Sequence, residues 1–247
     1  MVRRVIVVGA SSGIGEAVVR RLCAAGDHVV AIARREVELR ALVDSVTRGR
    51  VGRADALVHD VTHTASVTGV FEDAVRLLGG GVDVLIFNAG VMPEPPAQGH
   101  DNAMDRHVFE VNVIGAVAWI NEAATWFSRT GAGVIVGVGS VAGERGRSGF
   151  PAYNASKAAL HTFLEAQRNR LARHGVRVVT IKPGPVQTAM LRGRQVPLTV
   201  TPEAVAAVIT DSIESGALVR YVHWVWGPIM QVIRNIPSFV FRRYGPP

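Results

Sequence analysis

The sequence predicts a single α/β domain of the Rossmann type, in which a doubly wound parallel sheet carries helices on both faces. Three observations support this fold class. Short apolar runs alternate with longer amphipathic segments, a glycine-rich loop follows the first apolar run, and the composition shows no break along the 247 residues. Strands and helices that alternate in this way pair in parallel through right-handed crossovers. One domain over residues 1–247 is expected, because α/β domains reach this length without splitting.

The expected elements follow one another regularly. Strands are predicted where apolar residues form a short run, at residues 4–8, 28–33, 56–59, 82–87, 134–139 and 176–181. Helices are predicted where apolar residues recur at helical spacing, at residues 16–25, 36–47, from 64 onward, 104–129 and 153–174. The sheet therefore has six or more strands, and ligands belong at its carboxyl edge.

Composition and charge narrow the class of protein. The single cysteine, Cys23, can form no internal disulfide, which fits a reducing compartment, and the chain opens on a strand without a signal peptide. We expect a cytoplasmic protein. The net charge of +7 comes from scattered bases with few aromatic residues among them, so nucleic acid is not an expected partner. A phosphorylated cofactor, an anionic membrane surface or solubility alone explains the charge. The eight histidines show no ligand spacing, so no metal site is predicted.

The glycine-rich loop predicts a dinucleotide site. Glycines permit a tight turn and let backbone N–H groups approach a pyrophosphate at the positive end of the following helix. The spacing is G-x-x-x-G-x-G, so the commoner G-x-G-x-x-G fingerprint is only partly met. A glycine turn without a ligand is the alternative. The candidate cofactor residues in the loop are Gly9, Ser11, Ser12, Gly13, Ile14 and Gly15.

The end of the second strand predicts which cofactor binds. A carboxylate at this place would bind the ribose hydroxyls of NAD, whereas arginine pairs with the extra phosphate of NADP. Ala33 stands there, followed by Arg34 and Arg35. Arg34, helped by Ser12 or Arg35, therefore favours NADP(H), with solvated surface arginines as the alternative.

Two further strand ends carry candidate cofactor contacts. Asp60, followed by Val61, offers an acceptor for an adenine amino group, or alternatively a cap for the next helix. The small residues in Asn88-Ala89-Gly90 leave room for a cofactor that lies across the sheet edge.

The stretch from residue 140 to residue 157 predicts the chemistry. Tyr153 and Lys157 lie four residues apart on a helix and so share one face. A neighbouring ammonium favours the phenolate and lowers the pKa of a tyrosine, which makes it a usable general acid or base. Ser140 ends a strand and offers a hydrogen bond to a substrate oxygen. An ordinary amphipathic helix is the alternative for the pair, and Asn112 by itself reads as a satisfied core amide.

In their order and spacing, these motifs resemble the short-chain dehydrogenase/reductase family over residues 4–190, including the Pro183-Gly184 pair. The resemblance implies that Tyr153 is the acid or base, that Ser140 orients the substrate oxygen, and that Lys157 holds the nicotinamide ribose. It also implies that Asn112 completes a proton relay through water and that the subunits form a homodimer or homotetramer. The remaining implied cofactor contacts are Tyr153, Lys157, Pro183, Gly184, Val186 and Thr188. Val8 stands where the family usually has threonine, which leaves one bracing hydrogen bond of the loop in question.

The carboxyl-terminal third carries a narrower resemblance. The segments at residues 142–145, 197–200 and 221–243 resemble the reductase subunit of decaprenylphosphoryl-ribose epimerases. This resemblance implies NADPH-dependent reduction of the 2-keto group of a polyprenyl-phosphoryl pentose that a flavoprotein partner supplies. Two alternatives remain. A general ketoreductase or alcohol dehydrogenase acting on a soluble metabolite shares every catalytic residue, and a non-catalytic NADP-binding scaffold would usually lack one of Ser140, Tyr153 and Lys157.

Two segments are expected to shape the substrate site. Residues 186–200, with Arg192 and Arg194, resemble a lid, and Met190 is expected to be apolar lining. Residues 221–247 form an amphipathic segment that is too short and too interrupted to span a bilayer. It is expected either to lie at a membrane interface or to pack on its own domain or a second subunit. Arginines between Ser140 and Tyr153 suit a phosphorylated substrate or simply face solvent; they are Arg145 and Arg147.

Overall fold

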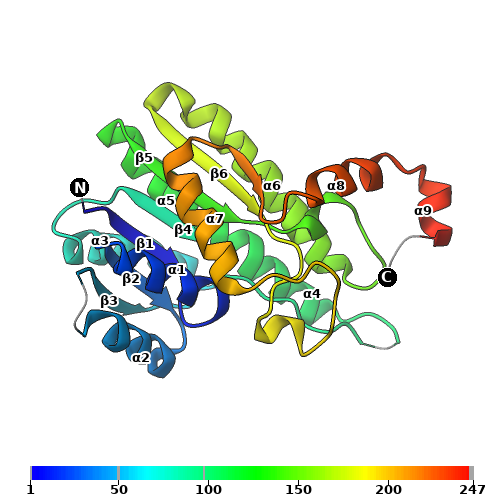
Figure 1. Ribbon diagram of the computed structural model, residues 1–247, viewed down its shortest axis with the longest axis horizontal. Coiled ribbons are helices and arrows are strands. Elements are labelled where there is room, and N and C mark those ends of the chain that lie inside the picture. Colours follow the sequence, from blue (N-terminus) through cyan, green and yellow to red (C-terminus); the bar gives the residue numbers. More distant parts are fainter. Residues whose placement is uncertain (1, 49–50, 97, 245–247) are drawn as a thin grey trace.

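The protein forms one seven-stranded parallel sheet with helices on both faces (Figure 1). The computed structural model describes residues 2–48, 51–96 and 98–244. The strand order is β3-β2-β1-β4-β5-β6-β7, so the chain winds outward from β1 first to one side and then, from β4 on, to the other. The strands are β1 (Arg4–Val8), β2 (His28–Ala33), β3 (Arg53–Val58), β4 (Val84–Phe87), β5 (Gly133–Val138), β6 (Val176–Lys182) and β7 (Val219–Tyr221). The predicted doubly wound parallel fold is confirmed.

Two cores flank the sheet, because successive side chains of a strand point to opposite faces. In β1, Val5 and Val7 join one core while Ile6 and Val8 join the other, and all four are fully buried. The first core is covered by α1 (Gly13–Ala24), α2 (Glu36–Thr47) and α7 (Pro202–Ser215). The second is covered by α3 (Val67–Leu77), α5 (Gly115–Thr130) and α6 (Pro151–Leu171). Strands buried on both faces read as continuous apolar runs, which is why they were found from the sequence.

Two strands differ most from the prediction, for physical reasons, and β4 begins two residues later than predicted, at Val84. β3 begins at Arg53, three residues before the predicted start, because its first half is polar: Asp55 binds the ring of His28 at 2.6 Å and Arg53 at 2.9 Å. A search for apolar runs overlooks such a strand start. β7 is three residues long and partly exposed, so it gives no apolar run at all.

The predicted helix at residues 104–129 is divided. It consists of α4 (Asn102–Phe109), a π-helical turn at Glu110–Ile114 and α5. Asp101 caps α4 by accepting a hydrogen bond from the N–H of Met104 at 2.9 Å. Single π turns within helices are often found at functional sites. This one places Asn112 in the interior.

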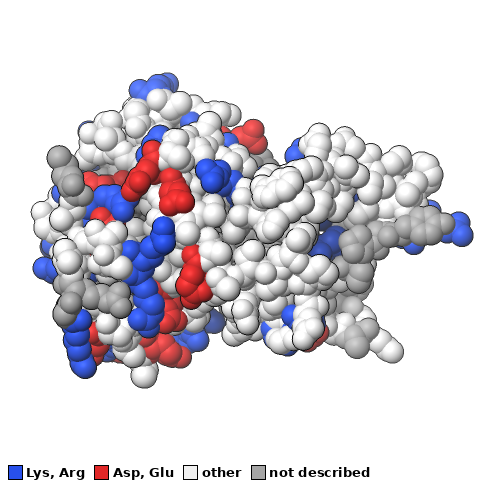
Figure 2. All heavy atoms as spheres, in the orientation of Figure 1, with Lys and Arg blue, Asp and Glu red and all other residues white. Residues whose placement is uncertain are grey.

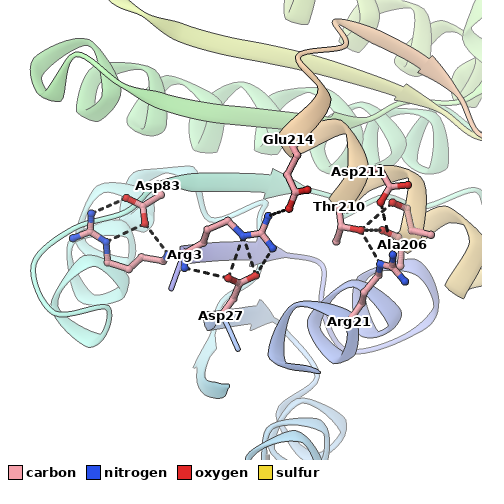
Figure 3. Close-up of polar contacts among 10 residues, drawn as sticks. Arg3, Arg21, Asp27, Asp83, Ala206, Thr210, Asp211 and Glu214 are labelled. Atoms are coloured by element: carbon pink, nitrogen blue, oxygen red, sulfur yellow. Dashed lines mark hydrogen bonds and ion pairs between the residues drawn. The ribbon is translucent and has the colours of Figure 1, made fainter. Parts of the chain in front are cut away.

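Ionic contacts fix α7 at the start of the sheet (Figure 3). Arg3 pairs with the buried Asp27 at 2.7 Å and with Glu214 of α7 at 2.8 Å. Arg21 of α1 donates to the hydroxyl of Thr210 at 2.7 Å. The helix that follows the predicted lid is therefore held to the amino-terminal half of the chain.

Short helical segments complete the structure, and the last two helices project beyond the carboxyl edge of the sheet (Figure 1). They are α8 (Trp226–Asn235) and α9 (Ser238–Tyr244). The single turns are η1 (Thr64–Ser66), η3 (Val141–Glu144), η4 (Ala172–His174) and η5 (Ala189–Leu191). In the described residues, no helix combines the length and the apolar character needed to cross a membrane.

Candidate active site

One cavity of about 670 Å³ runs along the carboxyl edge of the sheet. The glycine loop after β1 and the end of β2 form one end of it. Ser140, Tyr153 and Lys157 line its middle, and side chains of α8 line the other end. Parallel strands bring their carboxyl ends to one edge, and for this reason residues far apart in the sequence meet here.

The glycine loop is a close-packed backbone cradle. Gly9 has φ +88°, and a Cβ at that position would lie 2.5 Å from the backbone nitrogen of Ala89. A Cβ at Gly15 would lie 2.0 Å from the carbonyl oxygen of Gly9. Asn88 holds the loop by donating from Nδ2 to the same oxygen at 2.9 Å. The cradle leaves no room for side chains and sits at the amino end of α1, which fits the pyrophosphate of a dinucleotide.

Hydrogen-bond donors gather where β2 ends. Arg35 donates to Ser11 Oγ at 3.0 Å and to Ser12 Oγ at 2.6 Å. Arg34 lies 3.6 Å from Asp60. The guanidinium that reaches the glycine loop is therefore that of Arg35, while Arg34 faces the end of β3.

Asp60 makes a local turn and does not cap a helix. Its Oδ1 accepts hydrogen bonds from the N–H and the hydroxyl of Thr62, at 3.0 and 2.9 Å. The next helical turn begins at Thr64 without a side-chain cap. The alternative that Asp60 caps the next helix is therefore wrong. Asp60 lines the cavity, and its contact with the adenine amino group stays a prediction.

Ser140 is positioned by His161, which the sequence reasoning missed. The N–H of Ser140 donates to Nε2 of His161 at 3.3 Å, and the Ser140 hydroxyl accepts from the N–H of Ala142 at 3.1 Å. Burial, reinforced by the nearby charge of Lys182, lowers the pKa of His161 to about 3, so the ring is neutral. A signal was present, since His161 lies four residues after Lys157 on the same helix face.

Tyr153 and Lys157 are both buried in α6, and the expected effect of the lysine on the phenol is not found. Burial raises the pKa of Tyr153, although hydrogen bonding to Ser140 and the charge of Arg147 act in the opposite direction. Lys157 Nζ lies 5.9 Å from the centroid of the tyrosine ring and donates to the carbonyl of Val138 at 2.9 Å. Burial lowers the pKa of Lys157 to about 8. The prediction of a lowered tyrosine pKa is wrong, because desolvation of the phenol outweighs the hydrogen bond to Ser140 and the charge of Arg147.

Asn112 is held entirely by protein groups. Its Oδ1 accepts from the N–H of Val91 at 2.8 Å, and its Nδ2 donates to the carbonyl of Val91 and to Ser156 Oγ, both at 3.0 Å. It does not line the cavity. The amide braces the chain just after Gly90, as the core alternative expects, and the relay through water stays a prediction.

A buried carboxylate joins the loop after Ser140 to the carboxyl-terminal elements. The Glu144 side chain is 4% exposed and accepts from Lys182 Nζ at 2.5 Å and from the Tyr221 hydroxyl at 3.0 Å. Arg234 of α8 lies 3.4 Å away. Burial by itself would raise the pKa of Glu144, but the hydrogen bond and charge of Lys182 bring the net pKa below its usual range.

Arg145 attaches α8 to the same loop. Its Nη1 donates to the carbonyls of Ile233, Arg234 and Ile236, at 2.8, 3.0 and 2.7 Å. Its guanidinium lies 4.3 Å from the ring centroid of Phe241 in α9. These carbonyls are the acceptors that a helix leaves unsatisfied at its carboxyl end, and a cation there also complements the helix dipole.

The predicted lid is a loop that lines the cavity and whose two ends are joined. An isolated bridge pairs Val186 with Val200, where the segment begins and ends. Arg192 pairs with Glu94 at 2.8 Å, and Arg194 contacts the same carboxylate. Thr188 packs against Gly13, since a Cβ on that glycine would lie 2.9 Å from its methyl group.

Most of the predicted site residues share this cavity. Those that line it are Gly9, Ser11, Ser12, Gly13, Ile14, Arg34, Arg35, Asp60, Val61, Asn88, Ala89, Gly90, Ser140, Tyr153, Lys157, Pro183, Gly184, Val186 and Thr188. Gly15 and Asn112 do not line it. The missed lining residues include Phe150, Trp226, Met230 and Ile233. In residues 2–48, 51–96 and 98–244, histidine, cysteine and acidic side chains form no group suited to a metal ion.

Known proteins resemble this chain in sequence and in structure. A family model described as short chain dehydrogenase matches residues 3–196. A farnesol dehydrogenase of Aedes aegypti is 37% identical over 75% of this chain and 78% of its own length. An uncharacterized oxidoreductase of Myxococcus xanthus is 36% identical over 79% of this chain and 77% of its own.

The structural comparison extends further along the chain. A variant of actinorhodin polyketide ketoreductase, crystallised with NADPH, has a TM-score of 0.82 and 27% sequence identity. The match covers 90% of this chain and 95% of that one. It therefore continues beyond residue 196, where the family model ends.

Proposed function

The chain belongs to the short-chain dehydrogenase/reductase family and is an NAD(P)-dependent oxidoreductase, and from this premise we propose that it is an NADPH-dependent ketoreductase. The observation that carries the proposal is the single cavity that joins the glycine cradle to Ser140, Tyr153 and Lys157. A cofactor seated on the cradle and a carbonyl beside Tyr153 would share one cavity. Sharing that space is what direct hydride transfer requires.

The catalytic roles follow from the positions of the side chains. When bound, the nicotinamide cofactor supplies a hydride to the carbonyl carbon. Tyr153 gives its phenolic proton to the carbonyl oxygen, and its raised pKa keeps that proton in place at neutral pH. Ser140 donates a hydrogen bond to the same oxygen. Lys157 supplies the positive charge that binds the ribose and stabilises the phenolate left behind.

The preference for NADPH rests on the cluster at the end of β2. Arg35 with Ser11 and Ser12 offers several donors to a phosphate on the adenosine ribose. Arg34 adds a second cation, and β2 ends in Ala33, which has no carboxylate for the hydroxyls of NAD. Asp60 would accept from the adenine amino group.

The substrate is proposed to carry an apolar portion that lies along α8. Trp226, Met230 and Ile233 of α8 line the cavity opposite the cofactor loop. This wall favours, as a second candidate, the 2-keto group of a polyprenyl-phosphoryl pentose supplied by a flavoprotein partner. A general ketoreductase needs only part of the same wall.

Membrane contact through the carboxyl-terminal segment belongs to that second candidate. Residues 216–247 contain no acidic residue, and their arginines are Arg220, Arg234, Arg242 and Arg243. Trp224, Val232 and Phe239 are exposed, and Figure 2 shows the projecting part largely uncharged on the face drawn. An anionic bilayer would take up apolar side chains between basic ones. Cosedimentation with vesicles containing phosphatidylglycerol, but not with pure phosphatidylcholine, is expected; equal recovery with both would count against it.

The first experiment is cofactor oxidation by the purified protein. NADPH and NADH are each supplied with a panel of small ketones and, in parallel, with a polyprenyl-phosphoryl 2-keto-pentose. Reduction that depends on NADPH supports the ketoreductase, and turnover of the lipid-linked sugar alone supports the second candidate. No reduction of any carbonyl would overturn the proposal. Light scattering of the same sample tests the proposed homodimer or homotetramer.

A further inference from the structure

The cavity is lined by arginines, and most of them are already engaged. The five are Arg34, Arg35, Arg145, Arg147 and Arg194. Arg34 pairs with Asp60, and Arg35 donates to Ser11 and Ser12 of the glycine loop. Arg145 donates to three backbone carbonyls from Nη1, and Arg194 is paired with Glu94. Four of the five therefore have structural partners.

Arg147 is the exception among these five arginines. Its guanidinium makes no hydrogen bond or ion pair with any residue that the structure describes, and its Nε is buried without a partner there. A guanidinium stays charged and can only donate. A buried donor left without an acceptor is unfavourable, and more so when it is charged. The terminal nitrogens also lack a partner among the described residues and are not buried, so an acceptor on a ligand in the cavity can reach the guanidinium.

The position of Arg147 places such a ligand group beside the reacting centre. The residue lies in the loop between η3 and α6, and its carbonyl accepts from Nδ2 of the buried Asn154 at 3.2 Å. Its charge acts on the phenol of Tyr153. The backbone is thus anchored to α6 one residue from the tyrosine, while the side chain lines the cavity.

The surroundings favour an anion. Among the described residues that line the cavity, Asp60 is the only acid, and it lies at the adenosine end with Arg34. Glu144 is turned away into its own buried contacts with Lys182 and Tyr221. The substrate end is therefore positive and contains no competing carboxylate.

A second unpartnered donor lies in the same cavity. Trp226 Nε1 is buried without a hydrogen-bond partner in the described part of the chain. The indole lies against Gly184, where a Cβ would come within 2.2 Å of that nitrogen. An indole N–H only donates, and none of the described residues supplies an acceptor for this one.

We propose that Arg147 is an anion-binding residue of the substrate site, and that the natural substrate carries a carboxylate or phosphate near the carbonyl that is reduced. The rest of the substrate lies along Met230 and Ile233 of α8. The inference rests on the proposed ketoreductase function and narrows its substrate to amphiphilic, anionic carbonyl compounds.

The test compares matched ketones that differ only in charge. Benzoylformate is paired with its ethyl ester, and a 2-ketoalkyl phosphate with the corresponding neutral alcohol. Wild-type enzyme with NADPH is expected to favour the anion of each pair. Arg147→Met is expected to lower kcat/KM for the anionic ketones about 10- to 100-fold and for the neutral ones less than about threefold, as for loss of a charge-assisted hydrogen bond. Arg147→Lys should restore part of the preference.

Controls separate this inference from the function on which it rests. Arg170→Met removes an equal charge from an exposed position near the end of α6. It should leave kcat/KM unchanged for both the anionic and the neutral ketones. The NADPH dissociation constant of Arg147→Met should match that of wild type if Arg147 binds the substrate. A tenfold rise in that constant would instead assign Arg147 to cofactor binding. An equal loss on charged and neutral ketones would assign it to the acidity of Tyr153. Either result overturns the inference and leaves the ketoreductase standing.

Binding without turnover supplies an independent measurement. Calorimetric titration of the wild-type complex with NADP⁺ is expected to show benzoylformate binding at least tenfold tighter than the ester, with the difference lost in Arg147→Met. If the neutral ketones are reduced but benzoylformate binds no tighter than its ester, the anion site is refuted and the ketoreductase function stands. A failure to reduce any ketone, with the difference present, would refute the proposed reaction and leave the site.

Discussion

The two ends of the cavity are built by different means. At the cofactor end, the shape comes chiefly from backbone atoms: Gly9 and Gly15 lie so close to neighbouring backbone that a Cβ on either would collide with it. At the substrate end, it comes from side chains, chiefly Glu144 and Arg145, which attach the carboxyl-terminal helices to the loop after Ser140. The first end tolerates little substitution. The second can be altered by changing single contacts.

The largest effect is expected at Tyr153, where the two ends meet. Tyr153→Phe removes the acidic proton but keeps the buried ring, so turnover should fall about 100- to 10,000-fold. NADPH affinity, measured by fluorescence titration, should change little, because the cradle is untouched. Retained turnover would remove the assigned mechanism and with it the idea of one joint site.

A pH profile tests Lys157 at the same junction. Because burial lowers the pKa of Lys157 to about 8, its charge is lost as pH rises through that value. In the free enzyme, kcat/KM for reduction should therefore fall up to about tenfold per pH unit above pH 8. The free energy of unfolding should instead rise with pH in this range. Between about pH 8 and 10 the unfolded chain still binds the proton that the folded chain has lost. A flat kcat/KM from pH 7 to 10 would contradict the assignment.

Gly15→Ala tests the backbone-built end. The new methyl group would meet the carbonyl of Gly9 at 2.0 Å, so the loop must shift. The NADPH dissociation constant is expected to rise about 10-fold or more, given a local strain of about 1–3 kcal/mol. The control is Gly69→Ala in α3, where nothing lies within 4 Å of a Cβ. That change should stabilise the fold by about 0.5–1 kcal/mol and leave NADPH binding unchanged.

Arg145→Ala tests the end built by side chains. Three carbonyls at the end of α8 and the ring of Phe241 lose their partner. We expect faster amide hydrogen exchange in α8 and α9 and a several-fold rise in KM for an apolar ketone, with NADPH affinity unchanged. Arg106→Ala, which breaks an exposed pair with Glu110, should do neither. Unchanged exchange in α8 would show that Arg145 does not hold the helix.

The same contrast explains what could be predicted from the sequence. Glycine and buried strand residues are dictated by local backbone geometry, so the fold class and the cofactor loop were evident in the order of the motifs. The polar start of β3 and the short, exposed β7 carry no such local pattern. The strand count was therefore left open.

At the substrate end, the decisive contacts join residues far apart in the chain. Glu144 meets Lys182 and Tyr221 only after the sheet has formed, and no spacing rule links them. The position of His161 could have been predicted, because it continues the helix face of Lys157. Its contact with Ser140 could not, since a buried neutral histidine behind a serine has no sequence motif of its own. The raised pKa of Tyr153 also followed from burial, a property of the finished fold.

The hydrogen bond from Asn88 to Gly9 has a consequence for how the protein is made. The glycine loop is synthesised before its brace, which lies 79 residues further along the chain, and before Thr188, which packs on Gly13. Parallel strands such as β1 and β4 pair only when the intervening chain exists. A nascent chain therefore cannot brace the nucleotide cradle before Asn88 has been synthesised, and the packing of Thr188 on Gly13 is added later still.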